Sequence, residues 1–229
     1  MIKAVVFDLD HTLFDRHATL RAMVPALRER FVVNPALSDD EIAAFWAYGD
    51  DHYVYDGWNY IFAYLCEHGV FTEPPEYDAY RTFIFENFAK VAVKYDYTLP
   101  MLEILKKDGY KVGLITNGGH ALQYKKLDLT GLLYVFDEII VSGDVMIEKP
   151  DKEIFLMMCE KLGVEPGECV YVGDNPKNDI GGAKKAGYHT IWIKSTGTWL
   201  PSVREPDESA DFVYEVPEKV KKIEANLKK

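Results

Sequence analysis

Cysteine, basic charge and long apolar runs are all scarce in this chain of 229 residues, and each shortage excludes a class of protein. The three cysteines, Cys66, Cys159 and Cys169, are too few and too widely spaced for a zinc knuckle or a complete disulfide framework. The apolar stretch near the amino terminus has only four residues and ends at Asp8, which is too short for a secretory or membrane segment. We therefore expect a cytoplasmic protein with reduced thiols.

Acidic residues outnumber basic ones, 37 to 26, which gives a formal net charge of −11. This balance argues against a broad surface for a nucleic acid polymer or an anionic membrane. It does not exclude a small anionic ligand, because backbone N–H groups, a single lysine or a metal ion can supply local positive charge. The glycine-rich loops GxxxxGK[ST] and GxGxxG, which cradle nucleotides, are also missing from the sequence.

The chain does contain a short apolar run, Ala4 to Phe7, that stops at two carboxylates, Asp8 and Asp10. A run of this composition predicts a strand covered on both faces, with the two acids at its carboxyl end. Open α/β sheets bind their ligands at that edge. Two neighbouring carboxylates repel each other, so a bound cation or proton is the first hypothesis; the alternative is that Asp8 ends a strand and Asp10 caps a turn.

Two patterns divide the chain. Residues 16–95 have helical periodicity and many aromatic side chains, whereas the sequence from Thr98 onward alternates helices with short apolar strands. The alternation predicts an α/β fold, a Rossmann-like doubly wound parallel sheet with crossover helices. The opening strand has to pair with strands almost a hundred residues later, so we expect a discontinuous core, residues 1–15 and 96–229, and an inserted all-helical unit, residues 16–95.

Local signals place the individual elements. Ser38 with Glu41 three residues later is a capping box, and Asp151 and Gly163 are suited to begin and end a helix. We expect strands at residues 111–116, 138–142, 169–173 and 189–193, a last edge strand at 212–214, and a solvated helix or tail at the lysine-rich end.

Three more polar clusters follow the later predicted strands, where their side chains should meet Asp8. They are Thr-Asn-Gly-Gly at residues 116–119, a lysine before a proline at 149–150, and Gly-Asp-Asn-Pro at 173–176 with Asp179. Each cluster alone is as well explained by a turn, a surface lysine or a helix cap. Together they supply acids for a hard cation and a lysine and hydroxyl for an anion, an inventory that suits Mg²⁺.

In order and spacing, the four clusters resemble the motifs of the haloacid dehalogenase-like (HAD) hydrolase superfamily. The matching residues are Asp8-Leu9-Asp10-His11-Thr12, Thr116-Asn117, Lys149-Pro150 and Gly173-Asp174 with Asp179. The resemblance covers residues 1–15 and 96–195. The helical insertion is similar in position and size to the helical cap of that superfamily, but it contains no substrate motif that we can match.

The resemblance implies a phosphatase that works through an aspartyl phosphate. Asp8 would be the nucleophile, and Asp10 would act first as general acid and then as general base. Thr116 and Lys149 would hold the phosphoryl oxygens, with Asn117 nearby. These roles agree with the chemistry of phosphoryl transfer, which needs in-line placement, neutralised oxygen charge and a proton for the leaving alkoxide.

The resemblance also implies a Mg²⁺ cofactor. Its ligands would be the Asp8 carboxylate, the backbone carbonyl of Asp10 and the Asp174 carboxylate. Asp179 would support the lysine or the metal shell. Members of the superfamily often carry a second acid after the first one of this last motif, where Asn175 stands here, so Asn175 is counted among the supporting residues.

Other reactions remain open within the same superfamily. A 2-haloacid dehalogenase uses the same nucleophile but expels halide, which needs no proton, and its first motif lacks the second aspartate; Asp10 therefore favours a phosphatase. A phosphomutase would pass the phosphoryl group to a second substrate, and a non-catalytic metabolite-binding regulatory module could share the fold.

The expected partner is a small phosphorylated metabolite such as a sugar phosphate or a nucleoside monophosphate, bound by a monomer or a small homo-oligomer. An aromatic cluster in the insertion is typical of core packing or an oligomer contact, with a stacking surface for a sugar or base as the alternative. The cluster comprises Trp46, Tyr48, His52, Tyr53, Tyr55, Trp58, Tyr60 and Tyr64.

Overall fold

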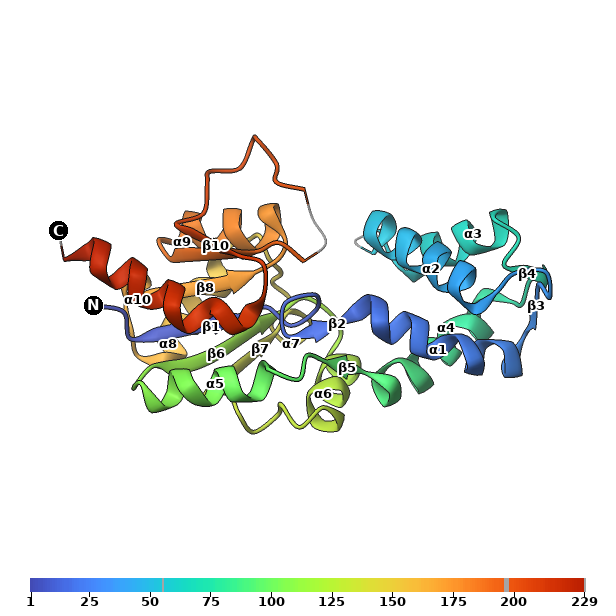
Figure 1. Cartoon of the computed structure of the whole chain (residues 1–229), viewed down its shortest axis with the longest axis horizontal. Coiled ribbons are helices and arrows are strands. Elements are labelled where there is room, and N and C mark those ends of the chain that lie inside the picture. Colours follow the sequence, from blue (N-terminus) through green and yellow to red (C-terminus); the bar gives the residue numbers. More distant parts are fainter. Residues whose placement is uncertain (55, 196–197, 229) are drawn as a thin grey trace. The chain divides into compact units, whose positions relative to one another are not determined.

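The structure, a computed structural model, describes residues 1–54, 56–195 and 198–228. The chain forms two compact units, shown as ribbons in Figure 1: one consists of Met1–Phe14 and Lys94–Lys229, the other of Asp15–Val93. The chain passes from one unit to the other at two short strands, β2 (Phe14–Asp15) and β5 (Val93–Lys94). Among the described residues, no helix is long and apolar enough to cross a membrane.

A six-stranded parallel sheet forms the centre of the larger unit, in the order β10-β9-β8-β1-β6-β7. The strands are β1 (Ala4–Phe7), β6 (Lys111–Thr116), β7 (Glu138–Val141), β8 (Cys169–Gly173), β9 (His189–Ile193) and β10 (Glu208–Ala210). The opening strand lies between β8 and β6, near the middle of the sheet. The predicted α/β class with a parallel sheet is therefore confirmed.

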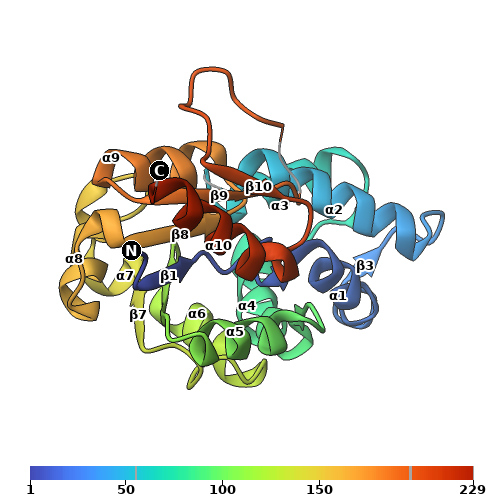
Figure 2. The ribbon, with the colours of Figure 1, turned by 60° about the vertical axis from the view of Figure 1, so that its left-hand side comes forward.

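Helices cover both faces of this sheet. Helices α5 (Thr98–Lys107) and α10 (Val216–Leu227) contact each other and the sheet on one face, and α8 (Lys152–Leu162) and α9 (Gly182–Ala186) do so on the other (Figures 1 and 2). Every residue of β1 is fully buried, and Ala4 and Val6 join the apolar core beneath α8. A strand covered on both faces explains the continuous apolar run at the start of the sequence.

The remaining elements of the larger unit are short. They are α6 (His120–Leu129), α7 (Ser142–Val145), η2 (Pro166–Glu168), the π-helical turn η3 (Pro176–Gly181) and η4 (Val213–Glu215).

Local helix signals in the sequence are confirmed. Ser38 and Glu41 form the predicted capping box, in which the Ser38 side chain accepts from the Glu41 N–H and the Glu41 side chain accepts from the Ser38 N–H. The Asp151 side chain accepts from the backbone of Glu153 at the start of α8. Gly163 ends that helix with a φ of 64°, a left-handed conformation that favours glycine.

The prediction of a last strand at residues 212–214 was wrong. The edge strand is β10, four residues earlier, where Ser209 and Ala210 pair with Trp192 and Ile193. Phe212 and Tyr214 are instead half exposed and stack on each other with ring centroids 5.5 Å apart. The lysine-rich end is also more than a solvated tail, because α10 buries Val220 and Ile223 against the larger unit.

The smaller unit is helical, as predicted, apart from one antiparallel pair of very short strands. Its helices are α1 (Arg16–Arg30), α2 (Asp39–Tyr53), α3 (Trp58–Glu67), α4 (Tyr77–Asn87) and η1 (Phe88–Val91), and its strands are β3 (Val32–Val33) and β4 (Phe71–Glu73). Strands of two or three residues leave no readable alternation in the sequence, which is why none was predicted there.

The aromatic cluster of the insertion divides between core and surface. Trp46 is fully buried, as the core-packing interpretation expects. Tyr48 is 49% exposed, and its ring stacks on His52 and on Tyr64, at centroid distances of 3.9 and 5.2 Å. Tyr55, another member of the predicted cluster, lies outside the described residues.

Candidate active site

The four motif clusters follow four strands that are neighbours in the sheet. Asp8 comes directly after β1, and its backbone N–H donates to the carbonyl of Val172 on β8. The next residues form a tight loop, in which the Leu13 N–H donates to Leu9 and His11 adopts a φ of 60°. This turn keeps Asp8 and Asp10 at the carboxyl edge of the sheet, where the sequence placed them.

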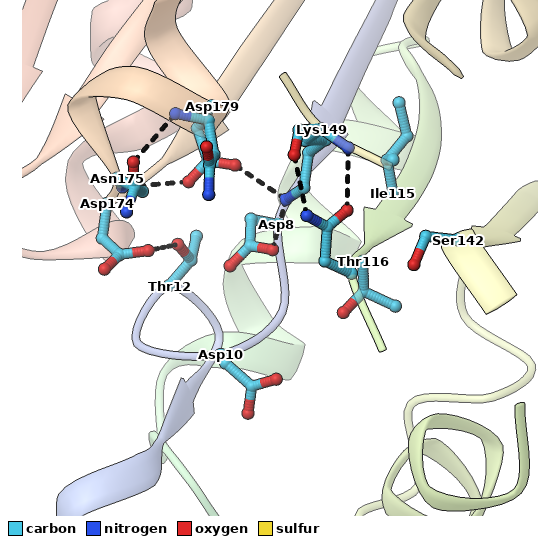
Figure 3. A network of polar contacts seen from close by, with 12 residues as sticks. Asp8, Asp10, Thr12, Ile115, Thr116, Ser142, Lys149, Asp174, Asn175 and Asp179 are labelled. Carbon is cyan, nitrogen blue, oxygen red and sulfur yellow. Dashed lines mark hydrogen bonds and ion pairs between the residues drawn. The ribbon is translucent and has the colours of Figure 1, made fainter. Parts of the chain in front are cut away.

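Lys149 lies at the centre of the hydrogen bonds of the site. Its ammonium donates to Asp8 Oδ1 at 2.6 Å and to Asp179 Oδ1 at 2.7 Å (Figure 3). It also donates to the hydroxyl of Tyr171 at 3.0 Å. An ammonium has three hydrogens, so these three acceptors satisfy it completely. Burial lowers the pKa of Lys149, but Asp179 and Asp8 outweigh that effect and hold the pKa well above its usual value. Lys149 is therefore a buried cation between two carboxylates.

Asn117 holds the backbone of Lys149. Its Oδ1 accepts from the Lys149 N–H and its Nδ2 donates to the Lys149 carbonyl, both at 2.9 Å. Sequence reasoning placed Asn117 near the phosphate; in the structure its amide orients the lysine. Thr116, the other predicted anion ligand of this loop, is buried and accepts from Gln123 Nε2 at 2.6 Å. Because the hydroxyl accepts this bond, its own hydrogen can be donated to another oxygen.

Three carboxylates gather beside Lys149. Oxygens of Asp8, Asp174 and Asp179 all lie within 4.8 Å of one another. Asp174 Oδ1 accepts from the Thr12 hydroxyl at 3.4 Å, and its backbone carbonyl accepts from Trp192 Nε1 at 2.7 Å. The three acids thus come from two adjoining strand ends, β1 and β8, and their hard oxygen donors suit Mg²⁺.

Local backbone geometry fixes Asp179. Its Oδ2 accepts from the Asn175 N–H at 2.9 Å, and a Cβ on Gly173 would lie only 2.5 Å from the Asp179 carboxyl. Glycine is needed at position 173 because Asp179 approaches the strand so closely. The Asn175 side chain accepts from Lys177 N and Asn178 N and so caps η3. Asn175 therefore acts on the local backbone.

Crowding of the acids makes their charged forms costly. Burial raises the pKa of Asp8 to about 7; Lys149 opposes this shift, and Asp179 and Asp10 add to it. Burial also raises the pKa of Asp174 well above its usual value, helped by the charges of Asp179 and Asp8. A divalent cation would offset this repulsion and favour the ionised carboxylates.

Asp10 belongs to a second polar group on the other side of the loop. In Figure 3 its carboxylate is turned away from Asp174. Both Asp10 oxygens contact the ammonium of Lys126, at 2.8 and 2.7 Å, and Oδ2 lies 3.3 Å from Gln123 Nε2. The metal ligand predicted at Asp10 is its backbone carbonyl, a separate group from the carboxylate that contacts helix α6.

Gln123 and Lys126 were missed by sequence reasoning. Both are almost fully buried, at 2% and 1% exposure, on the face of α6 that continues with Leu127. The available signal was their spacing, because residues three apart on a helix share a face. Two polar side chains on the buried face of the helix that follows the Thr116 loop indicate a polar partner beneath it.

A family model for haloacid dehalogenase-like hydrolases matches residues 2–187. The chain belongs to this family. Glyceraldehyde 3-phosphate phosphatase of Methanopyrus kandleri is 30% identical over 237 residues, and the match covers 100% of both chains. These findings confirm the resemblance read from the motifs and support assignment of the enzyme as a phosphoric monoester hydrolase.

Solved structures of this HAD family include both phosphatases and dehalogenases. The crystal structure of a HAD phosphatase from Thermococcus onnurineus is 31% identical, with a TM-score of 0.66 over 96% of this chain and 98% of that one. A 2-haloacid dehalogenase from Pseudomonas syringae is 26% identical, with a TM-score of 0.63 over 97% of this chain and 99% of that one. The fold is therefore shared by proteins named as a phosphatase and as a dehalogenase.

Proposed function

We propose that this HAD enzyme is a Mg²⁺-dependent phosphatase that hydrolyses a small phosphorylated metabolite through an aspartyl phosphate on Asp8. The observation that carries the proposal is the position of Asp8, which touches Lys149 and lies within the acidic cluster of Asp174 and Asp179. A nucleophile, a phosphate-binding cation and a cation site then share one sheet edge.

In the first step, a carboxylate oxygen of Asp8 attacks the phosphorus atom of the ester. The bond from phosphorus to the ester oxygen breaks, and Asp10 gives its proton to the departing alkoxide. Lys149, which exchanges one of its three acceptors for a phosphoryl oxygen, and the Thr116 hydroxyl hold the phosphoryl oxygens as charge moves onto them. Lys149 already contacts Asp8 Oδ1, so it lies within reach of a group bound to that carboxylate.

In the second step, Asp10, now ionised, takes a proton from water. The resulting hydroxide attacks the phosphorus atom of the acyl phosphate, and the bond between phosphorus and the Asp8 oxygen breaks. Inorganic phosphate leaves, Asp8 is again a carboxylate and Asp10 is again protonated. One carboxylate thus serves both steps, and the bonds formed and broken add up to ester hydrolysis.

Magnesium fits the donor set beside Asp8. Asp8 and Asp174 would hold it, with the Asp10 carbonyl as a further oxygen donor and Asp179 supporting Lys149. When bound, the ion neutralises oxygen charge on the phosphoryl group and offsets repulsion among the acids. The Thr12 hydroxyl donates to Asp174 Oδ1 and restrains that carboxylate.

The proposal also includes candidate substrates. The relative named glyceraldehyde 3-phosphate phosphatase matches the full chain, so a triose phosphate is the first candidate among small sugar phosphates. A nucleoside monophosphate is the second candidate, on the strength of the exposed tyrosines of the insertion alone.

The proposal is tested by phosphate release from a panel of esters, with and without Mg²⁺. The panel contains glyceraldehyde 3-phosphate, hexose phosphates and nucleoside monophosphates, together with a 2-haloacid assayed for halide. We expect Mg²⁺-dependent phosphate release by the wild type and its loss in Asp8→Asn. The matched control is Asp128→Asn, an exposed aspartate on α6 of the same unit.

Three outcomes would overturn the proposal. Undiminished turnover in Asp8→Asn would rule out an aspartyl phosphate on Asp8 as the intermediate. Halide release without phosphate release would favour the dehalogenase reaction. Formation of an isomeric sugar phosphate in place of inorganic phosphate would identify a phosphomutase.

A further inference from the structure

Side-chain packing does not explain why a charged ammonium is buried at position 126. The side chain is 1% exposed on α6, beside the fully buried Leu127, and its Nζ lies 5.2 Å from the ring centroid of Phe14. An apolar side chain would fill such a position at less cost, because burying an ammonium is unfavourable unless it is paired. Lys126 pairs with Asp10, and this pairing offers a reason for the charge.

Lys126 contacts both oxygens of the Asp10 carboxylate, at 2.8 and 2.7 Å. A single contact would leave the carboxylate able to rotate, whereas two contacts to one rigidly held ammonium restrict both side-chain torsions. The Asp10 side chain is 21% exposed, so packing alone does not hold it. Lys126 therefore supplies the restraint that burial does not.

Gln123, one turn earlier on α6, contributes less to this restraint. Its Nε2 lies 2.6 Å from Thr116 Oγ1, 2.9 Å from the Asn117 carbonyl and 3.3 Å from Asp10 Oδ2. An amide nitrogen has two hydrogens, and the two short contacts use them. Gln123 mainly ties α6 to the phosphate loop, which leaves Lys126 as the principal partner of Asp10 in this group.

We propose that Lys126 is the positioning residue of the acid/base step: it holds Asp10 in the orientation from which Asp10 serves the leaving oxygen and then the attacking water. The proposal rests on the proposed phosphatase function. Helix α6 then links two parts of the reaction, since it fixes Asp10 through Lys126 and the phosphate-binding hydroxyl of Thr116 through Gln123.

The test compares Lys126→Met and Lys126→Arg with the matched control Lys125→Met, a neighbouring and more exposed lysine of the same helix. With an alkyl phosphate, we expect kcat to fall on the order of 100-fold in Lys126→Met, the usual cost of misplacing a catalytic group. KM should change little, because Lys126 is not placed on the phosphate. Lys126→Arg should recover part of the loss, and Lys125→Met should resemble the wild type.

A second readout separates positioning from folding. The nitrophenolate of p-nitrophenyl phosphate leaves without protonation, so Lys126→Met should still form the aspartyl phosphate and release a stoichiometric burst of nitrophenolate. The steady rate after the burst should fall, because hydrolysis of the intermediate still needs Asp10 as base. A damaged fold would remove the burst as well as the steady rate, and that result would overturn the proposal.

The double variant Asp10→Asn/Lys126→Met shows whether Lys126 acts through Asp10. We expect it to be no slower than Asp10→Asn alone, because residues that act as a unit are not additive. Independent, multiplying losses would contradict the proposal. Should the wild type release no phosphate from any ester, the proposed function fails. Crystal structures would then decide on Lys126, since an Asp10 side chain unmoved in Lys126→Met would refute the positioning role.

Discussion

At the scale of single residues, Lys149 organises the site because it is the cation between two buried acids. Asp8 and Asp179 each accept from its ammonium, and the three side chains are 10% exposed or less. Asn117 fixes the backbone of the same lysine from the neighbouring strand end. Removing the ammonium would therefore affect folding as well as phosphate binding.

We predict that Lys149→Met loses activity and about 3–5 kcal/mol of unfolding free energy at neutral pH, the usual effect of leaving a buried charge without its partner. Burial already raises the pKa of Asp8 to about 7 with Lys149 in place, and the variant raises it further. Between pH 7 and the unfolded-state value of about 4, the folded variant then binds more protons than the unfolded chain.

The stability of metal-free Lys149→Met should therefore rise as the pH falls through this window, as that of the wild type does; the deficit relative to the wild type should narrow as the pH falls toward 7 from alkaline values, where only the variant keeps Asp8 protonated. Urea unfolding at several pH values measures this deficit. The matched control is Lys152→Met, which replaces an exposed lysine of α8. A deficit that does not shrink as the pH falls from alkaline values to 7 would show that repulsion between unpaired carboxylates is not its cause.

Residues that follow an apolar strand could be predicted from the sequence, and residues on a helix face could not. Asp8 and Asp174 directly follow strands, Thr116 ends strand β6, and Lys149 follows β7 after the short helix α7, so chain order places them at one edge. Lys126 enters the site only through the packing of α6, which depends on the angle of the helix.

At the scale of elements, the end of strand β8 and the turn η3 act together to place the last acid. The chain leaves β8 at Gly173, and Asp179 folds back over that glycine, with Asn175 capping the turn between them. Because the Asp179 carboxyl lies so close to the backbone of Gly173, it reaches the ammonium of Lys149.

We predict that Gly173→Ala displaces Asp179 and lowers both activity and stability, the latter by about 1–3 kcal/mol, a typical cost of overpacking. The new Cβ would lie 2.5 to 2.6 Å from three atoms of the Asp179 side chain. In Gly167→Ala, the control, the Cβ would meet nothing within 4 Å. Thermal unfolding and steady-state rates compare the two, and equal behaviour would contradict the role given to Gly173.

Buried strands were easier to predict than the edge strand. The runs at 111–116, 169–173 and 189–193 are apolar because helices cover both faces of the sheet that they form, so composition and position agree. Strand β10, Glu-Ser-Ala, has weak strand propensity and is set by pairing with β9, whereas the aromatic Phe-Val-Tyr four residues later looked more like a strand. Pairing with β9 determines which residues form the edge strand, and that pairing cannot be recognised in the local sequence.

At the scale of the whole molecule, a chain with a net charge of −11 is proposed to bind an anion. The overall field opposes that binding, so the attraction has to be local. Fully ionised, Asp8, Asp174 and Asp179 outnumber Lys149 by two charges, which a single divalent cation balances. The account therefore makes the cation part of the site.

Trapping the phosphoryl group on Asp8 tests the central claim most directly. A ³²P-labelled ester accepted by the enzyme is mixed with the protein and Mg²⁺, quenched in acid within one turnover, and the protein is digested and mapped. We expect label on the peptide that contains Asp8, released by hydroxylamine as an acyl phosphate is, and absent from Asp8→Asn and from samples without Mg²⁺. Turnover by the wild type with no label on that peptide at any quench time, or label on a different residue, would contradict the account.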